Sequence, residues 1–452
     1  MKSLFGTDGI RAEAGQFPLD PSTIKSIGYS LARHLNDAES QPKIVIGRDT
    51  RESGGWIEQA LISGATEGGA ECHSAGVITT PGVAYLTRTL PADAGVVISA
   101  SHNPFQDNGI KIFSPSGQKM SDSVEKQIEQ DVFLAQTDNQ TLIPDQLIDA
   151  SLEFEAALTD RYLNFLAEEI GRGLSLSGLS LVIDCANGAS FNIAPRLFQK
   201  LGAQVIAINC EPDGRNINLN CGSLHIEALQ QRVLAEKANL GVAFDGDADR
   251  SLFVDECGNY VDGDGALWVL AKNLQDHNHL QGNVVVATVM SNLGLEVALR
   301  SRNIGLIRAD VGDKYVLDEL LRVRGSLGGE QSGHVIMPSL SLAGDGMITA
   351  LCLLRSLTEA NEPLSLLLDG LEHYPQTLVN VRVREKTPFA DLPLVQKAVA
   401  DVEERLSAHG RLLLRYSGTE RLARVMIEGR SQEEIEYFAA QIASAISQEI
   451  GV

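Results

Sequence analysis

Residues 96–104 read VVISASHNP, a run that begins with three β-branched residues and stops at a proline. Such residues favour a buried strand and proline cannot continue a ladder, so the sequence predicts a strand that ends here. The following turn presents Ser101 beside His102 on a rigid support. A hydroxyl next to an imidazole suits the covalent transfer of a chemical group. An ordinary turn, with Ser and Asn bonding their own backbone, is the alternative.

A second apolar run, 240–244, precedes three carboxylates at alternate positions: Asp245, Asp247 and Asp249. Crowded carboxylates repel one another, so the cluster predicts a bound cation. An EF-hand loop is excluded although Glu256 stands at its twelfth position, because Arg250 replaces the required glycine and the flanks favour strands. Mg²⁺ that keeps waters or a substrate phosphate fits so few carboxylates better than caged Ca²⁺. A solvated acidic turn is the alternative.

Two glycine-rich segments carry further polar groups. The segment 328–334, GGEQSGH, offers Glu330, Ser332 and His334, which are groups that can grip sugar hydroxyls. The segment 415–420, RYSGTE, offers a guanidinium, two hydroxyls and a glycine that permits close backbone approach, and it predicts a phosphate clamp. The clamp residues are Arg415, Ser417, Gly418 and Thr419, with Arg424 in support. Taken alone, each segment is better explained as a plain loop or, for RYSGTE, as a hairpin turn with a surface arginine.

The composition is that of a globular protein. A chain of 452 residues suggests about three domains, and the hydrophobic fraction of 44% is ample for their cores. No run approaches the roughly 18 apolar residues of a transmembrane helix, and the first residues lack the apolar region of a signal peptide. The six cysteines form no CxxC pair, which argues against a zinc site or a disulfide scaffold. We therefore expect free thiols, a cytoplasmic location and no membrane partner.

The net charge of −22 argues against nucleic acid as a partner. An anionic substrate would then need a local positive cleft within a negative surface. Seven basic residues inside or beside the motifs are expected to form that cleft: Arg11, Arg48, Arg51, Lys111, Arg250, Arg415 and Arg424. Pairing of these residues with the abundant acids is the alternative.

The order strand, polar turn, helix, glycine, strand recurs from about residues 43, 181 and 284, which predicts βαβ units on parallel sheets. The last portion differs and predicts an α+β domain. Its expected elements are a strand at 378–383, a helix at 394–408, two strands flanking RYSGTE, and a terminal helix after the capping-box residue Ser431. Linkers are expected at 135–145, 255–264 and 370–376.

Together, these segments resemble the α-D-phosphohexomutase superfamily over essentially the whole chain. They occur in the order of that family, from FGTDGIR at 5–11 to RYSGTE. The segments PDGRNIN at 212–218 and RADVGDKYV at 308–316 resemble the branch that acts on glucosamine phosphates. Relatives usually have proline after SGTE, whereas this chain has Arg421, which adds a positive charge near the expected phosphate site.

The resemblance implies an α/β fold of four domains around a central cleft. Three would be similar βαβ-type mixed-sheet domains and the fourth a C-terminal α+β lid. The expected range of the first domain is 1–140, with the serine loop at 98–104, and that of the second is 150–255, with the metal loop at 245–250. The third is expected at 256–368, with the sugar loop at 328–334, and the fourth at 374–452, with the phosphate clamp at 415–420.

The implied activity is the interconversion of glucosamine 6-phosphate and glucosamine 1-phosphate, on the route to UDP-N-acetylglucosamine and cell-wall precursors. A phosphoserine and a bisphosphorylated sugar, glucosamine 1,6-bisphosphate, would carry the phosphoryl group. Ser101 matches the phosphoserine, with Ser99 as the fallback. The resemblance leaves room for a homodimer, and its only other implied partner is a small sugar phosphate.

By the same resemblance, each motif residue has an implied role. One Mg²⁺ per chain would be bound by Ser101, Asp245, Asp247 and Asp249. The catalytic groups around the reacting phosphate would be Ser101, His102, Lys111, Arg250 and Arg11. The sugar would be held by Glu330, Ser332 and His334, and its second phosphate by Arg415, Ser417, Gly418, Thr419 and Arg424.

Three alternatives remain open on sequence grounds. The same chemistry could act on glucose or mannose phosphates. A serine hydrolase is disfavoured because the chain has no G-x-S-x-G elbow and its acidic cluster would be idle. A non-catalytic protein that binds a cation or sugar would carry no covalent phosphate.

Overall fold

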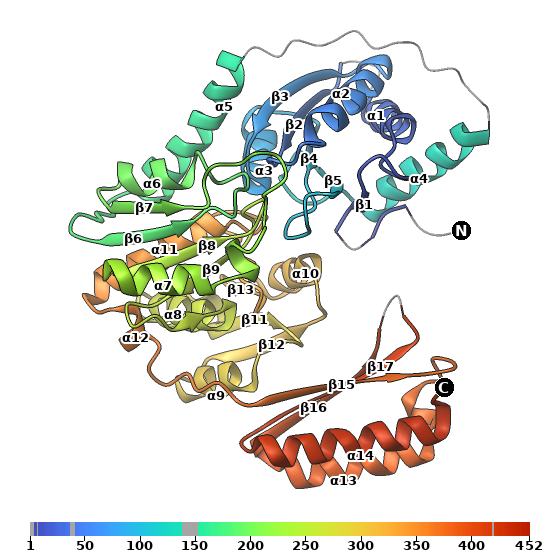
Figure 1. Ribbon diagram of the computed structural model, residues 1–452, viewed down its shortest axis with the longest axis vertical. Helices are drawn as coiled ribbons and strands as arrows, with labels where there is room; N and C mark the ends of the chain where they lie inside the picture. The colour runs from blue at the N-terminus through green and yellow to red at the C-terminus, as the bar shows by residue number, and fades with distance from the viewer. Residues whose placement is uncertain (1–3, 7, 37–40, 138–151, 418–419) are drawn as a thin grey trace. The chain divides into compact units, whose positions relative to one another are not determined.

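The computed structural model describes residues 4–6, 8–36, 41–137, 152–417 and 420–452 (Figure 1). It divides into two compact units. Unit 1 comprises residues 1–288 and 309–369, and unit 2 comprises 289–308 and 370–452. Among the described helices, none combines the length and apolarity needed to cross a membrane.

The first sheet of unit 1 has the strand order β1-β5-β4-β2-β3. Strand β2 is parallel to β3 and β4, whereas β5 is antiparallel to β4 and β1. All five residues of β4 are buried, as expected for a central strand covered on both faces. The strands are β1 (Ile10–Glu13), β2 (Lys43–Arg48), β3 (Glu71–Val77), β4 (Ala94–Ile98) and β5 (Asp107–Phe113). The helices are α1 (Pro21–Leu35), α2 (Gly54–Glu67), α3 (Thr80–Thr89) and α4 (Asp122–Thr137).

The second sheet has the strand order β10-β9-β8-β6-β7, in which β9, β8, β6 and β7 correspond to β5, β4, β2 and β3 of the first sheet. The edge strand differs, because β10 follows β9 in the chain whereas β1 precedes all other strands. Strand β6 is parallel to β7 and β8, and β9 is antiparallel to β8 and β10. The strands are β6 (Ser180–Asp184), β7 (Gln204–Ile208), β8 (Leu240–Phe244), β9 (Ser251–Val254) and β10 (Tyr260–Val261). The helices are α5 (Leu152–Asn164) with a π-helical extension (Phe165–Ile170), α6 (Ala194–Lys200), a 3₁₀ turn (Gly222–Leu224) and α7 (Glu227–Glu236).

The third sheet contains two strands, β13 and β14, that are only two residues long. Strand β11 (Val284–Thr288) is parallel to β13 (Gly328–Gly329), and β13 is antiparallel to β14 (Val335–Ile336). The accompanying helices are α8 (Gly263–Asp276), a 3₁₀ turn (Gln281–Asn283), α10 (Asp313–Val323), α11 (Gly346–Ala360) and α12 (Leu364–Leu367).

Strands β4, β8 and β13 occupy the same position in the three sheets. Each has a parallel strand on one side and, on the other, the antiparallel strand that follows it in the chain. The turn after each of these strands carries one of the polar motifs, beginning at Ser99, Asp245 and Glu330. The fold therefore places the serine, metal and sugar loops at equivalent strand ends.

Unit 2 contains α9 (Leu293–Ser301), residues 305–308 of β12 (Gly305–Ala309), and an antiparallel sheet of order β15-β17-β16. The strands are β15 (Gln376–Arg382), β16 (Gly410–Tyr416) and β17 (Leu422–Gly429). The helices are a 3₁₀ turn (Phe389–Asp391), α13 (Pro393–Leu406), a second 3₁₀ turn (Ser407–His409) and α14 (Gln432–Ile450).

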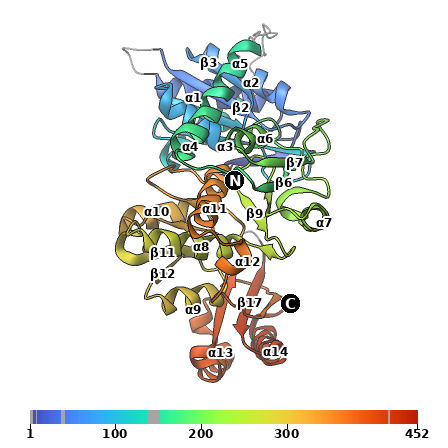
Figure 2. The ribbon, with the colours of Figure 1, turned by 90° about the vertical axis from the view of Figure 1, so that its left-hand side faces the viewer.

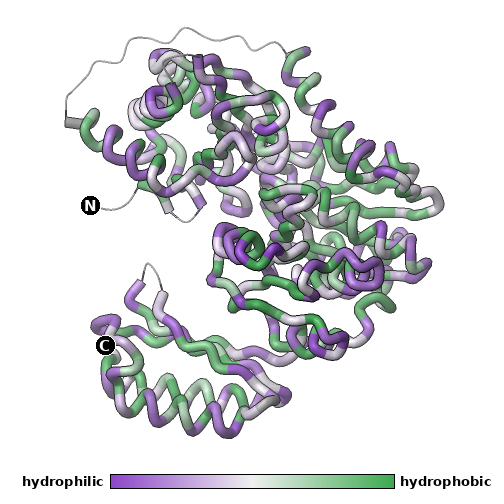
Figure 3. The backbone as a smooth tube through the Cα atoms, turned by 180° about the vertical axis from the view of Figure 1, so that it is seen from behind, coloured by the Kyte–Doolittle hydropathy of each residue, from purple (hydrophilic) through white to green (hydrophobic). Residues whose placement is uncertain are grey.

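Helices α13 and α14 cover one face of this sheet (Figures 1 and 2). Their apolar faces form a core with β15 and β17 through residues such as Val395, Val425 and Phe438. In Figure 3 hydrophobic and hydrophilic residues alternate along both helices, as expected for helices with one buried face. The Ser431 side chain accepts from the backbone of Glu434, which confirms the predicted cap.

The predicted βαβ units that begin near residues 43 and 181 are confirmed, since β2 is parallel to β3 and β6 is parallel to β7. In the third predicted unit the strand, helix and strand occur in the expected order. The α+β character of the last portion is also confirmed. The stretch 255–264 is not a free linker, because it contains β10, which pairs with the preceding strand β9, and the start of α8 at Gly263. Much of 135–145 lies outside the described residues.

Candidate active site

Ser101 lies in the turn that follows strand β4, with a backbone φ of 52° and a side chain that is almost fully buried. Its hydroxyl donates to Asp245 Oδ2 at 2.6 Å and lies 3.2 Å from His102 Nδ1. A non-glycine residue in the left-handed region stores strain that the surrounding contacts must hold, a condition found often at functional sites. The turn thus aims one hydroxyl directly at the acidic loop.

Contacts beneath the turn hold it in this conformation. Ser99 Oγ donates to Asp49 at 2.6 Å and accepts from the Ser101 backbone N–H at 2.9 Å. Asn218 donates to the carbonyl oxygens of Ser101 and Asn103 at 2.9 and 3.1 Å. The hydroxyl of Ser99 is therefore part of the support, whereas that of Ser101 faces the acidic loop.

The metal loop also comes close to the serine turn. A Cβ atom at Gly246 would lie 2.5 Å from the Ser101 carbonyl oxygen, so only glycine permits this approach. The backbone of Thr80, at the start of α3, donates to the Asp247 carbonyl at 3.0 Å. The two loops are therefore packed as one body.

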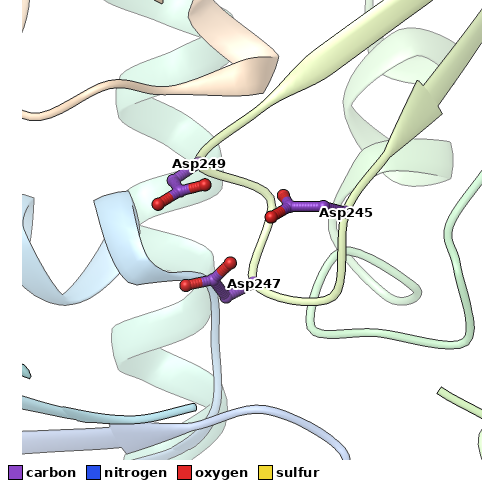
Figure 4. Close-up of side chains that lie close together, drawn as sticks. All are labelled: Asp245, Asp247 and Asp249. Carbon is purple, nitrogen blue, oxygen red and sulfur yellow. The ribbon is translucent and has the colours of Figure 1, made fainter. Parts of the chain in front are cut away.

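The three aspartates of the metal loop form a candidate cation site (Figure 4). All are buried, and one oxygen from each lies within 4.8 Å of the others. Asp247 Oδ2 accepts from Thr80 Oγ1 at 2.6 Å and from Lys111 Nζ at 3.0 Å. Asp247 Oδ1 and Asp249 Oδ1 are buried and lack a hydrogen-bond partner among the described residues. Because such oxygens are costly to leave unpaired, this donor set fits a hard cation.

The charges of this cluster shift its pKa values strongly. Burial, with Asp249 and Asp247 nearby, raises the pKa of Asp245 well above its usual range. Burial also opposes ionisation of Asp249, but Lys111, His334 and Arg250 lower its pKa well below that range. Burial, followed by Arg250 and Arg11, lowers the pKa of His102 to about 4, which favours the neutral imidazole at pH 7.

Basic groups surround the acidic cluster. Burial would lower the pKa of Lys111, yet Asp247, Asp8 and Asp249 raise it well above its usual value, so the group is a buried ammonium. Arg250 Nε lies 3.8 Å from Asp249 Oδ1, and Arg11 forms an ion pair with Asp8. The Nε atoms of both arginines are buried without a hydrogen-bond partner among the described residues.

Arg48 and Arg51 do not belong to this group, which corrects the expectation that both line a positive cleft. Arg48 pairs with the buried Glu58 at 2.8 Å. Arg51 is fully buried, pairs with Asp49 at 2.8 Å, and donates to the carbonyl oxygens of Ser101, Asn103, Pro104 and Asp107. Both guanidinium groups are part of the scaffold, and Arg51 supports the serine turn from below.

The sugar loop approaches the metal loop through His334. This buried imidazole lies 3.7 Å from Asp249 Oδ2 through Nδ1 and 3.8 Å from Asp313 Oδ2 through Nε2. Glu330 accepts from the Gly312 backbone at 2.9 Å and from Ser332 Oγ at 3.2 Å. The glutamate is thus oriented by both neighbours.

A cavity of about 440 Å³ lies in unit 1 beside these groups. Lys111, Asp249 and His334 contribute to one wall, and apolar side chains such as Phe113 and Leu317 contribute to the remainder. The cavity separates the β5–α4 connection from helix α10.

The phosphate-clamp candidates lie in unit 2. Burial, then the neighbouring Arg424, lowers the pKa of Arg415. These residues are opposite each other on β16 and β17, and Arg424 Nε is buried without a hydrogen-bond partner among the described residues. Ser417 is buried and its hydroxyl accepts from the Glu420 backbone at 3.3 Å. Gly418 and Thr419 lie outside the described residues.

Several residues at the site were missed by the sequence analysis. They are Asp8, Asp49, Thr80, Lys119, Asn218 and Asp313. Asp8, Asn218 and Asp313 stand within segments that carried the family resemblance, and this was the one signal available for them. Thr80 and Lys119 stand in no motif that was singled out.

Family models for phosphoglucomutase/phosphomannomutase match four successive parts of the chain. Alpha/beta/alpha domain I matches residues 2–138, domain II matches 160–258, domain III matches 262–374, and the C-terminal domain matches 378–445.

Curated relatives match the chain from end to end. A phosphoglucosamine mutase of Solibacter usitatus is 51% identical over 453 residues, covering 100% of this chain and 99% of the relative. The phosphoglucosamine mutases of Koribacter versatilis and Chlamydia abortus are each 44% identical, covering 100% of this chain and 98% of the relative.

Solved structures share the fold at lower identity. A phosphoglucomutase/phosphomannomutase family protein from Burkholderia thailandensis superimposes with a TM-score of 0.78 at 22% identity, covering 100% of both chains. The Aspergillus fumigatus N-acetylphosphoglucosamine mutase, solved with GlcNAc-6P and magnesium, gives 0.66 at 18% identity and covers 98% of this chain and 95% of that one. The full-length identity, the four matched domains and the shared fold show that the chain belongs to the phosphoglucosamine mutase family of the α-D-phosphohexomutases.

Proposed function

We propose that this enzyme interconverts glucosamine 6-phosphate and glucosamine 1-phosphate by passing a phosphoryl group through Ser101. The observation that carries the proposal is the 2.6 Å contact between the Ser101 hydroxyl and Asp245, within a buried cluster of three carboxylates. A serine in that position can bear a phosphoryl group whose charge needs both a cation and basic side chains. The curated relatives with this name, 44–51% identical over the whole chain, support the same activity.

Asp245, Asp247 and Asp249, together with phosphorylated Ser101, would hold one Mg²⁺ per chain. When bound, the ion would draw charge from the phosphoryl group and stabilise the departing serine oxygen. The unpaired Oδ1 atoms of Asp247 and Asp249 support this ligand set. Magnesium appears with the Aspergillus relative, and its identity here is part of the proposal.

The basic groups around the cluster would bind the reacting phosphate. Arg250 and Arg11 each have an Nε donor that is still available, and Lys111 is a fixed ammonium that can bind phosphate oxygens. His102, neutral at pH 7, would orient the Ser101 side chain. The set of basic residues proposed to bind phosphate is thus smaller than the set expected from the sequence, because Arg48 and Arg51 are part of the scaffold.

In the forward direction, a hydroxyl of the sugar attacks phosphoserine 101. The bond from phosphorus to the serine oxygen breaks, a bond to the sugar oxygen forms, and the hydroxyl proton passes to a nearby base. The resulting glucosamine 1,6-bisphosphate turns over and returns its other phosphate to Ser101. Glu330, Ser332 and His334 would hold the sugar in both orientations.

The remaining phosphate would be bound by Arg415, Ser417, Gly418, Thr419 and Arg424. The unpaired Nε of Arg424 and its cross-strand position opposite Arg415 support an anion site in unit 2. We propose that this C-terminal domain closes over the substrate as a lid and excludes water, which would otherwise hydrolyse the phosphoserine. A central cleft between four domains, with borders near 1–140, 150–255, 256–368 and 374–452, belongs to the same proposal.

A cytoplasmic location is proposed because all six cysteines are free thiols, as expected in a reducing compartment. A homodimer and the absence of nucleic-acid or membrane partners stay predictions.

The test is a substrate panel. Wild-type enzyme with Mg²⁺ should convert glucosamine 6-phosphate with a higher kcat/KM than glucose 6-phosphate or mannose 6-phosphate. A better rate on either of the other sugars would refute the assignment to the glucosamine branch and leave the phosphoryl chemistry intact. No conversion of any of the three would refute the mutase assignment itself and favour a binding protein.

A further inference from the structure

Six side chains beside the proposed reaction centre form a closed ring in which carboxylates alternate with nitrogen groups. In order around the ring, the members are Asp249, His334, Asp313, Lys119, Asp8 and Lys111. The successive nitrogen–oxygen distances, starting from the Asp249–His334 pair, are 3.7, 3.8, 2.7, 2.5, 3.4 and 3.3 Å. All six lie within unit 1.

The ring joins segments that are far apart in sequence. Lys111 is on β5, Asp8 precedes β1, and Lys119 lies between β5 and α4. Asp313 begins α10, and the other two members belong to the sugar and metal loops. The ring therefore fastens these two loops to elements of the first sheet.

Half of the ring already has a place in the proposed reaction, namely Asp249, Lys111 and His334. The other half does not. Within that other half, Lys119 connects the two carboxylates, because its ammonium lies 2.5 Å from Asp8 Oδ1 and 2.7 Å from Asp313 Oδ1. Its side chain is only 20% exposed, so solvent screens these contacts weakly.

We propose that Lys119 is a positioning residue that fixes the His334 imidazole through Asp313 and the Lys111 ammonium through Asp8. This role rests on the proposed function. Without Lys119, the carboxylates of Asp8 and Asp313 lose their shared cation. Asp8 would keep its contacts with Arg11 and Lys111, and Asp313 its hydrogen bond from the Lys314 backbone, but nothing in the ring would hold the two carboxylates together. Each of them contacts a group beside the reacting phosphate. A displacement of about 1 Å in such groups can cost on the order of 10²-fold in rate.

A second ion pair supplies a matched control. Lys314, the residue after Asp313, pairs with Asp122 at the start of α4. It thus joins helix α10 to the same neighbourhood as the Lys119–Asp313 bridge, yet its ammonium forms no ion pair with a member of the ring. The Lys314 backbone N–H donates to Asp313 Oδ1 at 2.8 Å, and Lys314→Met leaves this contact in place. If these lysines act only by holding α10 against the segment between β5 and α4, Lys314→Met should lower kcat as much as Lys119→Met does.

The variants are expected to fold. Lys119 lines the cavity of about 440 Å³, so a methionine of similar length fits there without steric conflict. Thermal midpoints of Lys119→Met and Lys314→Met, compared with wild type, verify this point before kinetics. Lys119→Arg keeps the positive charge and serves as the conservative variant.

The experiment measures kcat and KM for glucosamine 6-phosphate in the full-length enzyme with Mg²⁺. Lys119→Met should lower kcat about 10- to 100-fold and change KM less than about threefold, because orientation and not binding is lost. Lys119→Arg should recover most of kcat, and Lys314→Met should stay within about twofold of wild type. Asp313→Asn should lower kcat, and adding it to Lys119→Met should cost little more, since both changes break one connection.

Three results would overturn the proposal: equal losses in Lys119→Met and Lys314→Met, a loss that appears only in KM, or fully additive losses in the Lys119→Met/Asp313→Asn pair. An inactive wild-type enzyme would instead refute the proposed function, so the two failures are distinguishable.

Discussion

Replacing Arg51 with methionine should destabilise the first domain severely. The guanidinium is completely buried, as is its partner Asp49, and the two are 2.8 Å apart. Four carbonyl oxygens of the serine turn and its flanks also accept from it. Methionine matches the length of the side chain but supplies none of these donors.

Removing one partner of a buried ion pair typically costs about 3–5 kcal/mol, since the other charge stays buried and unpaired. A domain is usually stable by about 5–15 kcal/mol, so this loss is a large share of the total. At roughly 2–4 °C per kcal/mol, the melting transition should fall by about 10 °C. Loss of the hydrogen bonds to the four carbonyl oxygens should lower the stability further.

The assay is thermal unfolding of wild type, Arg51→Met and Arg215→Met. Arg215 is a suitable control because it pairs with Glu52 at 2.6 Å on the surface, with 67% of its side chain exposed. Exposed pairs contribute little to stability, so Arg215→Met should melt within a few degrees of wild type. Equal shifts for the two variants would refute the scaffold role of Arg51.

The Arg51→Met defect should depend on pH. Burial already raises the pKa of Asp49, and Arg51 opposes that rise. Without the arginine, the folded-state pKa rises further above its unfolded value near 3.9. A raised carboxyl pKa means that stability is fully present below the unfolded pKa and is lost as pH rises through the folded pKa. Unfolding at pH 5 should therefore show a smaller defect than at pH 8, and a pH-independent defect would contradict this account.

Further predictions concern the metal loop and the phosphate clamp. Asp247→Asn should lower kcat on the order of 10²–10³-fold, and chelation with EDTA should abolish activity until Mg²⁺ is restored; full activity after thorough chelation would remove the metal from the scheme. Arg415→Ala should raise KM strongly and also lower kcat while Ser101 remains phosphorylated, and an unchanged KM would move the phosphate anchor elsewhere. Arg421 donates to the Arg384 carbonyl at 3.2 Å from an exposed position, so Arg421→Pro should keep KM within about twofold; a marked rise in KM would make Arg421 part of the clamp.

The sequence was informative where chemistry is local. A buried strand followed by a polar turn predicted both the serine loop and the metal loop, because each motif directly follows a strand end. The equivalence of β4, β8 and β13 depends on which strands pair, and pairing across long stretches of chain leaves little local trace.

The scaffold around the site was harder to predict for the same reason. Arg51 and Lys111 look alike in a list of basic residues, yet Arg51 is enclosed by Asp49 and backbone carbonyls, whereas Lys111 reaches the acidic cluster. Thr80 bonds Asp247 across 167 residues of chain, and no periodic pattern marks it. Only tertiary structure decides which acid a base will face.

The central claim is that Ser101 carries the phosphoryl group during turnover. The most direct measurement follows the phosphopeptide that contains Ser101 by rapid quench and mass spectrometry, after phosphorylated enzyme is mixed with glucosamine 6-phosphate. The account predicts one phosphoryl group on Ser101, its transfer to the sugar at least as fast as kcat, and neither phosphopeptide nor turnover in Ser101→Ala. Turnover by Ser101→Ala, or transfer from Ser101 slower than kcat, would contradict it.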